Sequence, residues 1–159
     1  MAKRSAGLLM YRRQDDNLAV FLVHPGGPFW AKKDMGAWSI PKGEYSESEQ
    51  PLETARREFQ EETGFTPEGD VVELGSVKQT GGKVVSVWAL EGDCDPSKLT
   101  SNRCQIEWPP RSGRLIDIPE VDRGGWFSLQ AAREHILKSQ APFLDMLVEK
   151  LNGAHALGD

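Results

Sequence analysis

The chain has 159 residues, of which 38% are hydrophobic and 27% are charged, and its formal net charge is −5. This length fits one compact domain, and the composition excludes the low hydrophobicity and high net charge of a disordered chain. The negative balance also excludes a global positive field that would bind a nucleic acid polymer or an anionic membrane surface, although a local site could still bind a small polyanion.

The apolar runs of the chain are only as long as strands, too short for a secretory leader or a membrane span. We therefore expect a cytoplasmic protein with a single domain over residues 1–159 and no nucleic acid polymer or membrane as partner, and a homodimer is left open. Cys94 and Cys104 are too few for a disulfide framework, so we expect two reduced thiols.

The first half of the chain predicts strands followed by one helix. Apolar runs at 6–11 and 18–24 flank a polar turn, and residues 36–43 predict a short strand that enters a loop. A helix is expected after this loop, because Pro51 suits a first helical turn and Gly64 suits a C-terminal stop.

The middle of the chain predicts further sheet and then less regular structure. Residues 71–78 and 83–90 are expected to form a hairpin. Residues 91–125 are rich in Pro, Gly, Asp, Ser and Arg, which predicts loops with brief strands near 103–107 and 115–118. This region gives the weakest structural signal.

The last part of the chain predicts two helices. One apolar stripe runs from the N-cap candidate Ser128 to Leu137, and another runs from Phe143 to the stop at Asn152-Gly153. Together with the earlier elements, this order indicates an α/β protein with a mixed sheet covered by helices.

Three glutamates are expected on one face of the first helix. Each residue advances about 100° around a helix, so Glu61 lies about 60° to one side of Glu58, and Glu62 about 40° to the other. Like charges at this spacing repel one another, and carboxylate oxygens suit Mg²⁺ as a compensating cation. The alternative is a solvated face paired with Arg56 and Arg57, which composition alone favours.

The spacing over a longer stretch reverses that preference. Gly43 is followed by five residues and Glu49, and then by seven residues and the run Arg57–Phe65, which reads REFQEETGF. This pattern resembles the Nudix box, G-x5-E-x7-R-E-U-x-E-E-x-G-U with U a bulky apolar residue, at every defined position. The resemblance implies a Nudix-type α/β/α sandwich and hydrolysis of a diphosphate linkage in nucleoside diphosphate derivatives, with Mg²⁺ as cofactor or Mn²⁺ in its place.

The resemblance also implies roles for individual residues. Glu58, Glu61 and Glu62 correspond to catalytic acids and metal ligands. The carbonyl of Gly43 corresponds to a further ligand, and Arg57 to an arginine that holds the acids in place through charge-assisted hydrogen bonds. Glu49 would be a supporting acid.

Members of this family often use one more acid from outside the box. The candidates are Glu107, Glu120 and Asp122. We favour Glu120 as an additional metal ligand, because it precedes Trp126-Phe127 where the family frequently places acids in a loop over the site.

Two residues before the box are candidates for binding the substrate. Lys42 resembles the lysine of a Pro-Lys-Gly approach, where a cation would face a phosphate. Trp38 is our candidate among the five tryptophans for stacking on a base. The working hypothesis is a nucleoside triphosphate or a dinucleoside polyphosphate, although the motif at Trp108–Gly113 matches no substrate signature.

Two alternatives stay open. An isomerase of isoprenyl diphosphates with the same fold would need a catalytic cysteine, and Cys94 and Cys104 both follow the box in an irregular region. A catalytically silent Nudix domain that binds a ligand is the other alternative, and the intact set of acids argues against it.

Overall fold

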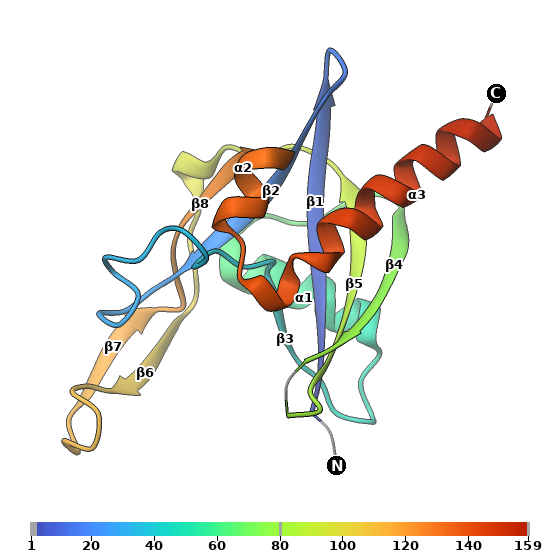
Figure 1. Ribbon diagram of the computed structural model, residues 1–159. Coiled ribbons are helices and arrows are strands. Elements are labelled where there is room, and N and C mark those ends of the chain that lie inside the picture. Colours follow the sequence, from blue (N-terminus) through green and yellow to red (C-terminus); the bar gives the residue numbers. More distant parts are fainter. Residues whose placement is uncertain (1–2, 80, 159) are drawn as a thin grey trace.

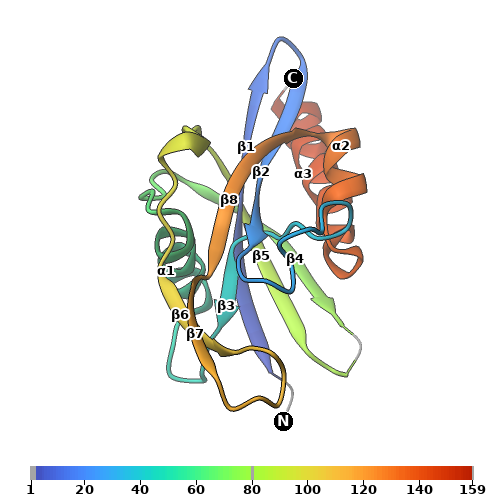
Figure 2. The same ribbon diagram turned by 90° about the vertical axis from the view of Figure 1, so that its left-hand side faces the viewer.

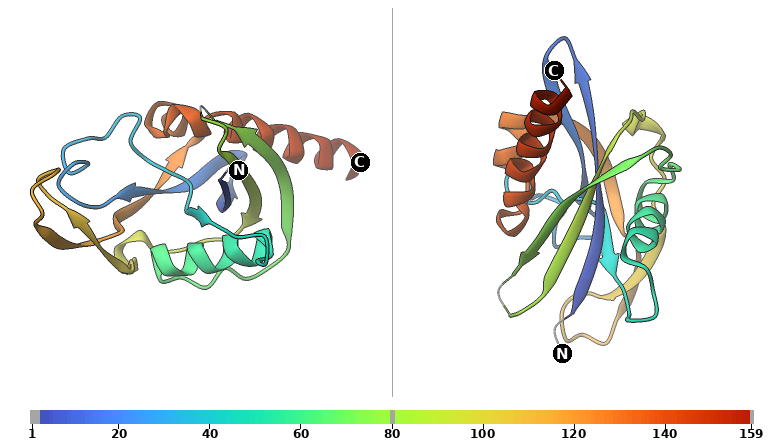
Figure 3. Two further views of the ribbon diagram at one scale, coloured as in Figure 1. Left: turned by 90° about the horizontal axis from the view of Figure 1, so that it is seen from below. Right: turned by 90° about the vertical axis from the view of Figure 1, so that its right-hand side faces the viewer.

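A mixed sheet with helices on both faces forms the body of the protein (Figure 1). The computed structural model describes residues 3–79 and 81–158, with side chains as far as residue 153. Helix α1 (Pro51–Thr63) covers one face, whereas α2 (Leu129–His135) and α3 (Pro142–Gly158) cover the other (Figure 3). This arrangement confirms the predicted α/β/α sandwich.

The main sheet has six strands, five of which lie in the order β4-β5-β1-β2-β8. The sixth strand, β3, pairs with residues 5–7 near the start of β1, whereas β2 pairs with residues 11–14 near its end. Strand β1 pairs in parallel with β5 and antiparallel with β2 and β3, so the sheet is mixed. A separate two-stranded hairpin consists of β6 and β7. The strand bounds are Arg4–Gln14 (β1), Asn17–Pro25 (β2), Lys42–Glu44 (β3), Val71–Lys78 (β4), Val84–Glu91 (β5), Arg103–Glu107 (β6), Leu115–Pro119 (β7) and Val121–Ser128 (β8).

Two clusters of buried side chains hold the layers together, one on each face of the sheet. Leu8 and Phe21 pack with Phe59 of α1, whereas the next residue of β1, Leu9, packs with Leu144 of α3. Successive side chains of a strand point to opposite faces, so a strand that is covered on both sides reads as a continuous apolar run.

Helix α1 has the predicted bounds. Proline stands in its first turn, and Gly64 follows with φ of 80°, the left-handed conformation that glycine adopts without steric cost. The helix ends there because the Gly64 amide donates to the Gln60 carbonyl and the chain then turns away.

The structure corrects the predicted strand over residues 36–43. The regular strand β3 covers only Lys42–Glu44, and residues 38 and 39 form isolated bridges. The Ser39 amide donates to the Val23 carbonyl, whereas the Ile40 amide donates to the side chain of the buried Gln140. The backbone of residues 38–40 therefore forms separate hydrogen bonds to distant residues instead of the regular hydrogen-bond ladder of a strand.

The last two helices differ from prediction in where they end. Ser128 caps α2 as expected, but the helix stops at His135 because Ile136 takes an extended conformation and is buried. Helix α3 continues past the expected stop at Asn152-Gly153 to Gly158.

The composition of residues 91–125 gives no signal for the first part of β8, which begins inside the region expected to be irregular. This strand pairs with β2 from Val121 to Ser128 and forms one edge of the sheet. It contains Gly124 and Gly125, which disfavour strands in isolation. A Cβ at Gly124 would overlap the ring of Phe21, so close packing against β2 explains that glycine.

Phe59→Ala tests the packing that holds α1 on the sheet. Phe59 is fully buried and its ring centroid lies 6.3 Å from that of Phe21. We expect the free energy of unfolding to fall by about 3–5 kcal/mol, measured by urea denaturation. Val72→Ala, at an exposed position on β4, should change it by less than about 0.5 kcal/mol. Similar values for the two variants would contradict this packing.

Candidate active site

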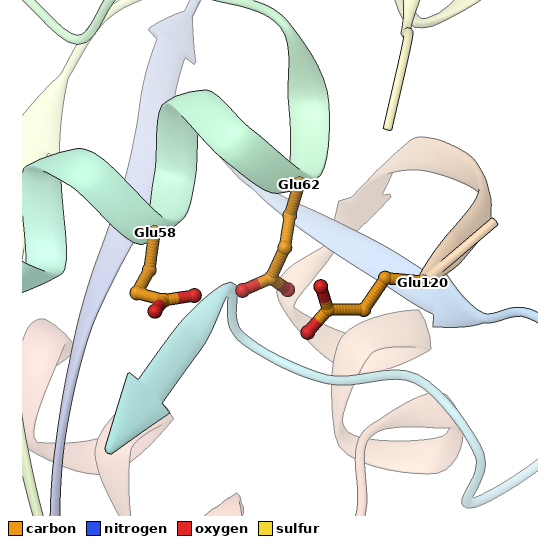
Figure 4. A group of neighbouring side chains, drawn as sticks. All are labelled: Glu58, Glu62 and Glu120. Atoms are coloured by element: carbon orange, nitrogen blue, oxygen red, sulfur yellow. The ribbon is translucent and has the colours of Figure 1, made fainter. Parts of the chain in front are cut away.

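Three carboxylates from two distant parts of the chain meet beside helix α1. Glu58 and Glu62 project from α1, and Glu120 lies in the junction between β7 and β8 (Figure 4). One oxygen of each lies within 4.8 Å of the others. Oxygens this close together can coordinate a single divalent cation.

The electrostatics of this carboxylate triad favour a bound cation. Glu62 is 5% exposed, and its Oε2 atom has no hydrogen-bond partner among the described residues. Burial, and then repulsion by Glu120 and Glu58, raise the pKa of Glu62 well above its ordinary value. Burial and the neighbouring Glu61 likewise raise the pKa of Glu58. A divalent cation would satisfy the unpaired oxygen and offset the repulsion, so these residues fit the metal that the acids imply.

Gly43 permits this arrangement by having no side chain. It lies in β3 directly beneath Glu58, and a Cβ at this position would overlap the Glu58 carboxyl group. The backbone of β3 can therefore approach the triad closely. Whether the Gly43 carbonyl is a metal ligand stays a prediction.

Arg57 lies between two of the predicted acids. Its Nη2 atom is 3.5 Å from Glu49 Oε2 and 3.5 Å from Glu58 Oε1. Glu49 in turn accepts hydrogen bonds from the amide and hydroxyl of Ser46, which lower its pKa. The guanidinium therefore lies within ion-pair distance of both acids, and an orienting role for Arg57 stays a prediction.

Glu61 lies outside the triad. Its side chain is exposed, and its carbonyl accepts a hydrogen bond from the Asn102 amide. It is near enough to raise the pKa of Glu58, so it borders the triad. A role for Glu61 as a metal ligand stays a prediction.

The two alternative acids from outside the box are engaged elsewhere. The oxygens of Glu107 accept hydrogen bonds from the amides of Arg111 and Gly113 in the hairpin tip. Asp122 Oδ1 lies 2.9 Å from His24 Nδ1. Glu120 is therefore the acid that the structure places with Glu58 and Glu62.

The two predicted substrate-binding residues have different surroundings. Lys42 is half-buried near Glu62, and burial lowers the pKa of its ammonium group. Trp38 is only 6% exposed, and its ring packs against Phe127 and His24 in the core cluster on the face opposite α1. This packing leaves little of the Trp38 ring for a base, which corrects the stacking role expected for it.

A groove lies at the start of α1, apart from the triad. Its volume is about 1010 Å³, and its lining runs from Glu44 to Pro51 together with Lys3 and Arg4. None of the three triad residues lines it. We therefore centre the site on the carboxylates.

Both cysteines are free thiols, as expected. Burial and the neighbouring Asp93 raise the pKa of Cys94 to about 12, which makes it a poor nucleophile at neutral pH. Burial also raises the pKa of Cys104. These environments do not favour an isomerase that depends on a catalytic cysteine.

Comparison with known sequences supports a single family. The model of the NUDIX domain matches residues 1–147. The asymmetrical bis(5'-nucleosyl)-tetraphosphatase of Rattus norvegicus is 35% identical over 102 residues, which cover 57% of this chain and 66% of that protein. A nucleoside triphosphate pyrophosphatase/Nudix hydrolase fusion protein of Bifidobacterium longum is 30% identical over 121 residues, which cover 72% of this chain and 24% of that protein.

Solved structures share the fold at low sequence identity. The NUDIX domain of Shewanella oneidensis NrtR, complexed with ADP ribose, has a TM-score of 0.66 at 18% identity, covering 95% of this chain and 89% of that one. A binary complex of an Ap4A hydrolase from C. elegans has a TM-score of 0.65 at 21% identity, covering 94% and 98%. Within the part of the chain described here, no helix has the length and apolar character needed to cross a membrane.

The raised pKa of Glu62 predicts a pH-dependent stability in the absence of metal. The folded protein binds the Glu62 proton more tightly than the unfolded chain, so stability should fall as pH rises above the ordinary value of 4.5. In EDTA, the wild type should therefore melt at a lower temperature at pH 8 than at pH 5. Glu62→Gln should reduce this difference, whereas Glu73→Gln, on the exposed side of β4, should not. A Glu62→Gln variant with the full pH dependence would contradict the assignment.

Gly43→Ala tests the close approach of β3 to the triad. The added methyl group must displace the Glu58 carboxyl, so we expect Mn²⁺ affinity to fall at least about tenfold by calorimetry. Gly153→Ala, at an exposed position of α3 with open space around it, is a control for the loss of a glycine and should leave Mn²⁺ affinity unchanged. Equal affinities in the Gly43→Ala and wild-type proteins would contradict the predicted contact.

Proposed function

The chain belongs to the Nudix domain family, and on that premise we propose that it is a Mg²⁺-dependent pyrophosphohydrolase that acts on dinucleoside polyphosphates or nucleoside triphosphates. The observation that carries this proposal is the triad, in which Glu62 is buried next to two further carboxylates and has an oxygen with no hydrogen-bond partner in the described part of the chain. A protein that only bound a neutral ligand would have no physical reason to keep three acids so close together.

The residues of the site suit attack by water on phosphorus. Glu58, Glu62 and Glu120 would hold the ion, and Glu61 and the carbonyl of Gly43 are proposed to assist. A divalent cation held there would neutralise phosphate oxygens and lower the pKa of a bound water.

The other side chains would orient the acids and the substrate. Arg57 would fix the orientation of Glu58, which would also accept a proton from the attacking water. Lys42 would face a phosphate from beside the triad.

The substrate proposal rests on named relatives. The rat protein that is 35% identical is an asymmetrical bis(5'-nucleosyl)-tetraphosphatase, and this chain covers 66% of its length. We therefore place dinucleoside polyphosphates first among substrates and nucleoside triphosphates second. Such compounds are available in the cytoplasm, where we expect the protein to act.

A substrate panel tests the proposed reaction. Purified protein with Mg²⁺, and separately with Mn²⁺, should be incubated with diadenosine tetraphosphate, nucleoside triphosphates, nucleotide sugars and ADP-ribose at neutral and alkaline pH. We expect metal-dependent cleavage that is fastest with diadenosine tetraphosphate, measured by chromatography of the products. An absence of cleavage of every compound with either metal would contradict the proposal.

Glu62→Gln separates catalysis by the triad from contaminating activity. The change removes a charge at nearly constant volume, so kcat should fall by about two orders of magnitude or more while the fold persists. The matched control Glu73→Gln removes an exposed charge from β4 and should retain full kcat. Normal turnover by Glu62→Gln would exclude Glu62 from the metal site.

A further inference from the structure

An aromatic and cationic cluster lies on the segment between β2 and β3, which the site described so far does not use. Phe29 is 52% exposed, although large apolar side chains are normally covered. The Lys33 Nζ atom lies 4.0 Å from the centroid of the Phe29 ring and 5.5 Å from that of Trp30. We call Phe29, Trp30 and Lys33 the aromatic–lysine cluster.

Contacts among its own side chains and with the core hold the cluster in place. The rings of Phe29 and Trp30 meet edge to face with centroids 5.1 Å apart, and Trp30 packs partly against the core cluster beneath it. The Lys33 ammonium forms no ion pair with the carboxylates in the described part of the chain. Its position over the rings therefore leaves one cation free to meet an anion.

Two contacts tie this segment to the strand junction that carries Glu120. The Gly26 amide donates to the Glu120 carbonyl at 3.0 Å. The buried His24 lies between the two chain segments, with Nε2 donating to the Lys33 carbonyl at 2.6 Å and Nδ1 2.9 Å from Asp122 Oδ1. These contacts fix the position of the segment that carries the cluster relative to the junction that carries Glu120.

The apolar face of the β6–β7 hairpin adjoins the same segment. Ile106 and Ile118 lie on that face and approach Gly27, where a Cβ would meet the side-chain ends of both. The segment and the hairpin lie on the same side of the sandwich in two views (Figure 1; Figure 3, left). The cluster is therefore placed at the end of the molecule where Glu120 lies.

We propose that the aromatic–lysine cluster binds a nucleotide moiety of the substrate, with the base on the exposed ring of Phe29 and a phosphate on Lys33. A nucleotide combines a flat aromatic group with a nearby anion, which matches an exposed ring beside a free ammonium. This inference rests on the proposed function for the identity of the substrate. It assigns recognition of the group beyond the cleaved linkage to residues outside the Nudix box.

Binding of the separate parts of a nucleotide tests the two roles independently of hydrolysis. The full-length protein in EDTA should be titrated with AMP, adenosine and ribose 5-phosphate, following the indole N–H signal of Trp30 by NMR. AMP should shift this signal in the wild type. Phe29→Ala should weaken binding of AMP and adenosine about tenfold, whereas Lys33→Met should weaken AMP but leave adenosine unchanged.

The matched control is Val72→Ala, which removes another exposed apolar side chain far along the sheet on β4 and should bind AMP like the wild type. Melting temperatures would verify that each variant is folded. Wild-type affinity for AMP in the folded Phe29→Ala variant would overturn the proposal, and so would an AMP titration that leaves the Trp30 signal unmoved.

Kinetics distinguish this inference from the proposed hydrolase activity. With diadenosine tetraphosphate, Phe29→Ala should raise KM about tenfold and leave kcat near that of the wild type, because the ring lies away from the triad. If the wild type cleaves the compound and Phe29→Ala has an unchanged KM, the cluster assignment is wrong and the hydrolase proposal stands. If the wild type cleaves nothing, the hydrolase proposal fails, and the AMP titration in EDTA still decides the cluster.

Discussion

The repulsion among Glu58, Glu62 and Glu120 is the constraint on which the candidate site depends. Burial and the close approach of the three acids raise the affinity of Glu62 and Glu58 for protons, and Glu62 Oε2 has no hydrogen-bond partner among the described residues. Folding brings them together only because tertiary packing fixes α1 on the sheet and the β7–β8 junction beside it. A divalent cation would turn this unfavourable cluster into a stable one, which couples metal binding to both stability and catalysis.

The fold supplies each part of this arrangement from a different layer. Phe59 seats α1 on the sheet, and Gly43 in β3 leaves room for the Glu58 carboxyl. Strand β8 pairs with β2 and begins directly after Glu120, so this pairing fixes Glu120 at the point where the β6–β7 hairpin rejoins the sheet. Figure 2 shows the hairpin projecting from β8. The same junction receives the contacts from Gly26 and His24 that position the aromatic–lysine cluster. The proposed metal site and the proposed nucleotide site would thus be positioned by the same β7–β8 junction.

Local sequence signals predicted the parts of the structure that are set within a few residues. Pro51 and Gly64 marked the ends of α1, and helical spacing placed Glu58 and Glu62 on one face. The Nudix resemblance supplied the fold, and the family match confirms it. Features that depend on distant partners were missed, because no local pattern reports them. Trp38 was expected to stack on a base, but its ring is buried in the core. The contact between His24 and Asp122 joins residues 98 positions apart in the sequence.

Binding of Mn²⁺, counted by electron paramagnetic resonance, tests most directly whether Glu120 completes a metal site with Glu58 and Glu62. The wild type and Glu120→Gln would be titrated at neutral pH, with Glu73→Gln as the matched control. The account predicts that Glu120→Gln weakens the tightest site at least about tenfold, whereas the control binds like the wild type. Wild-type affinity in a folded Glu120→Gln protein would contradict it, because the two acids of α1 would then hold the ion without the β7–β8 junction.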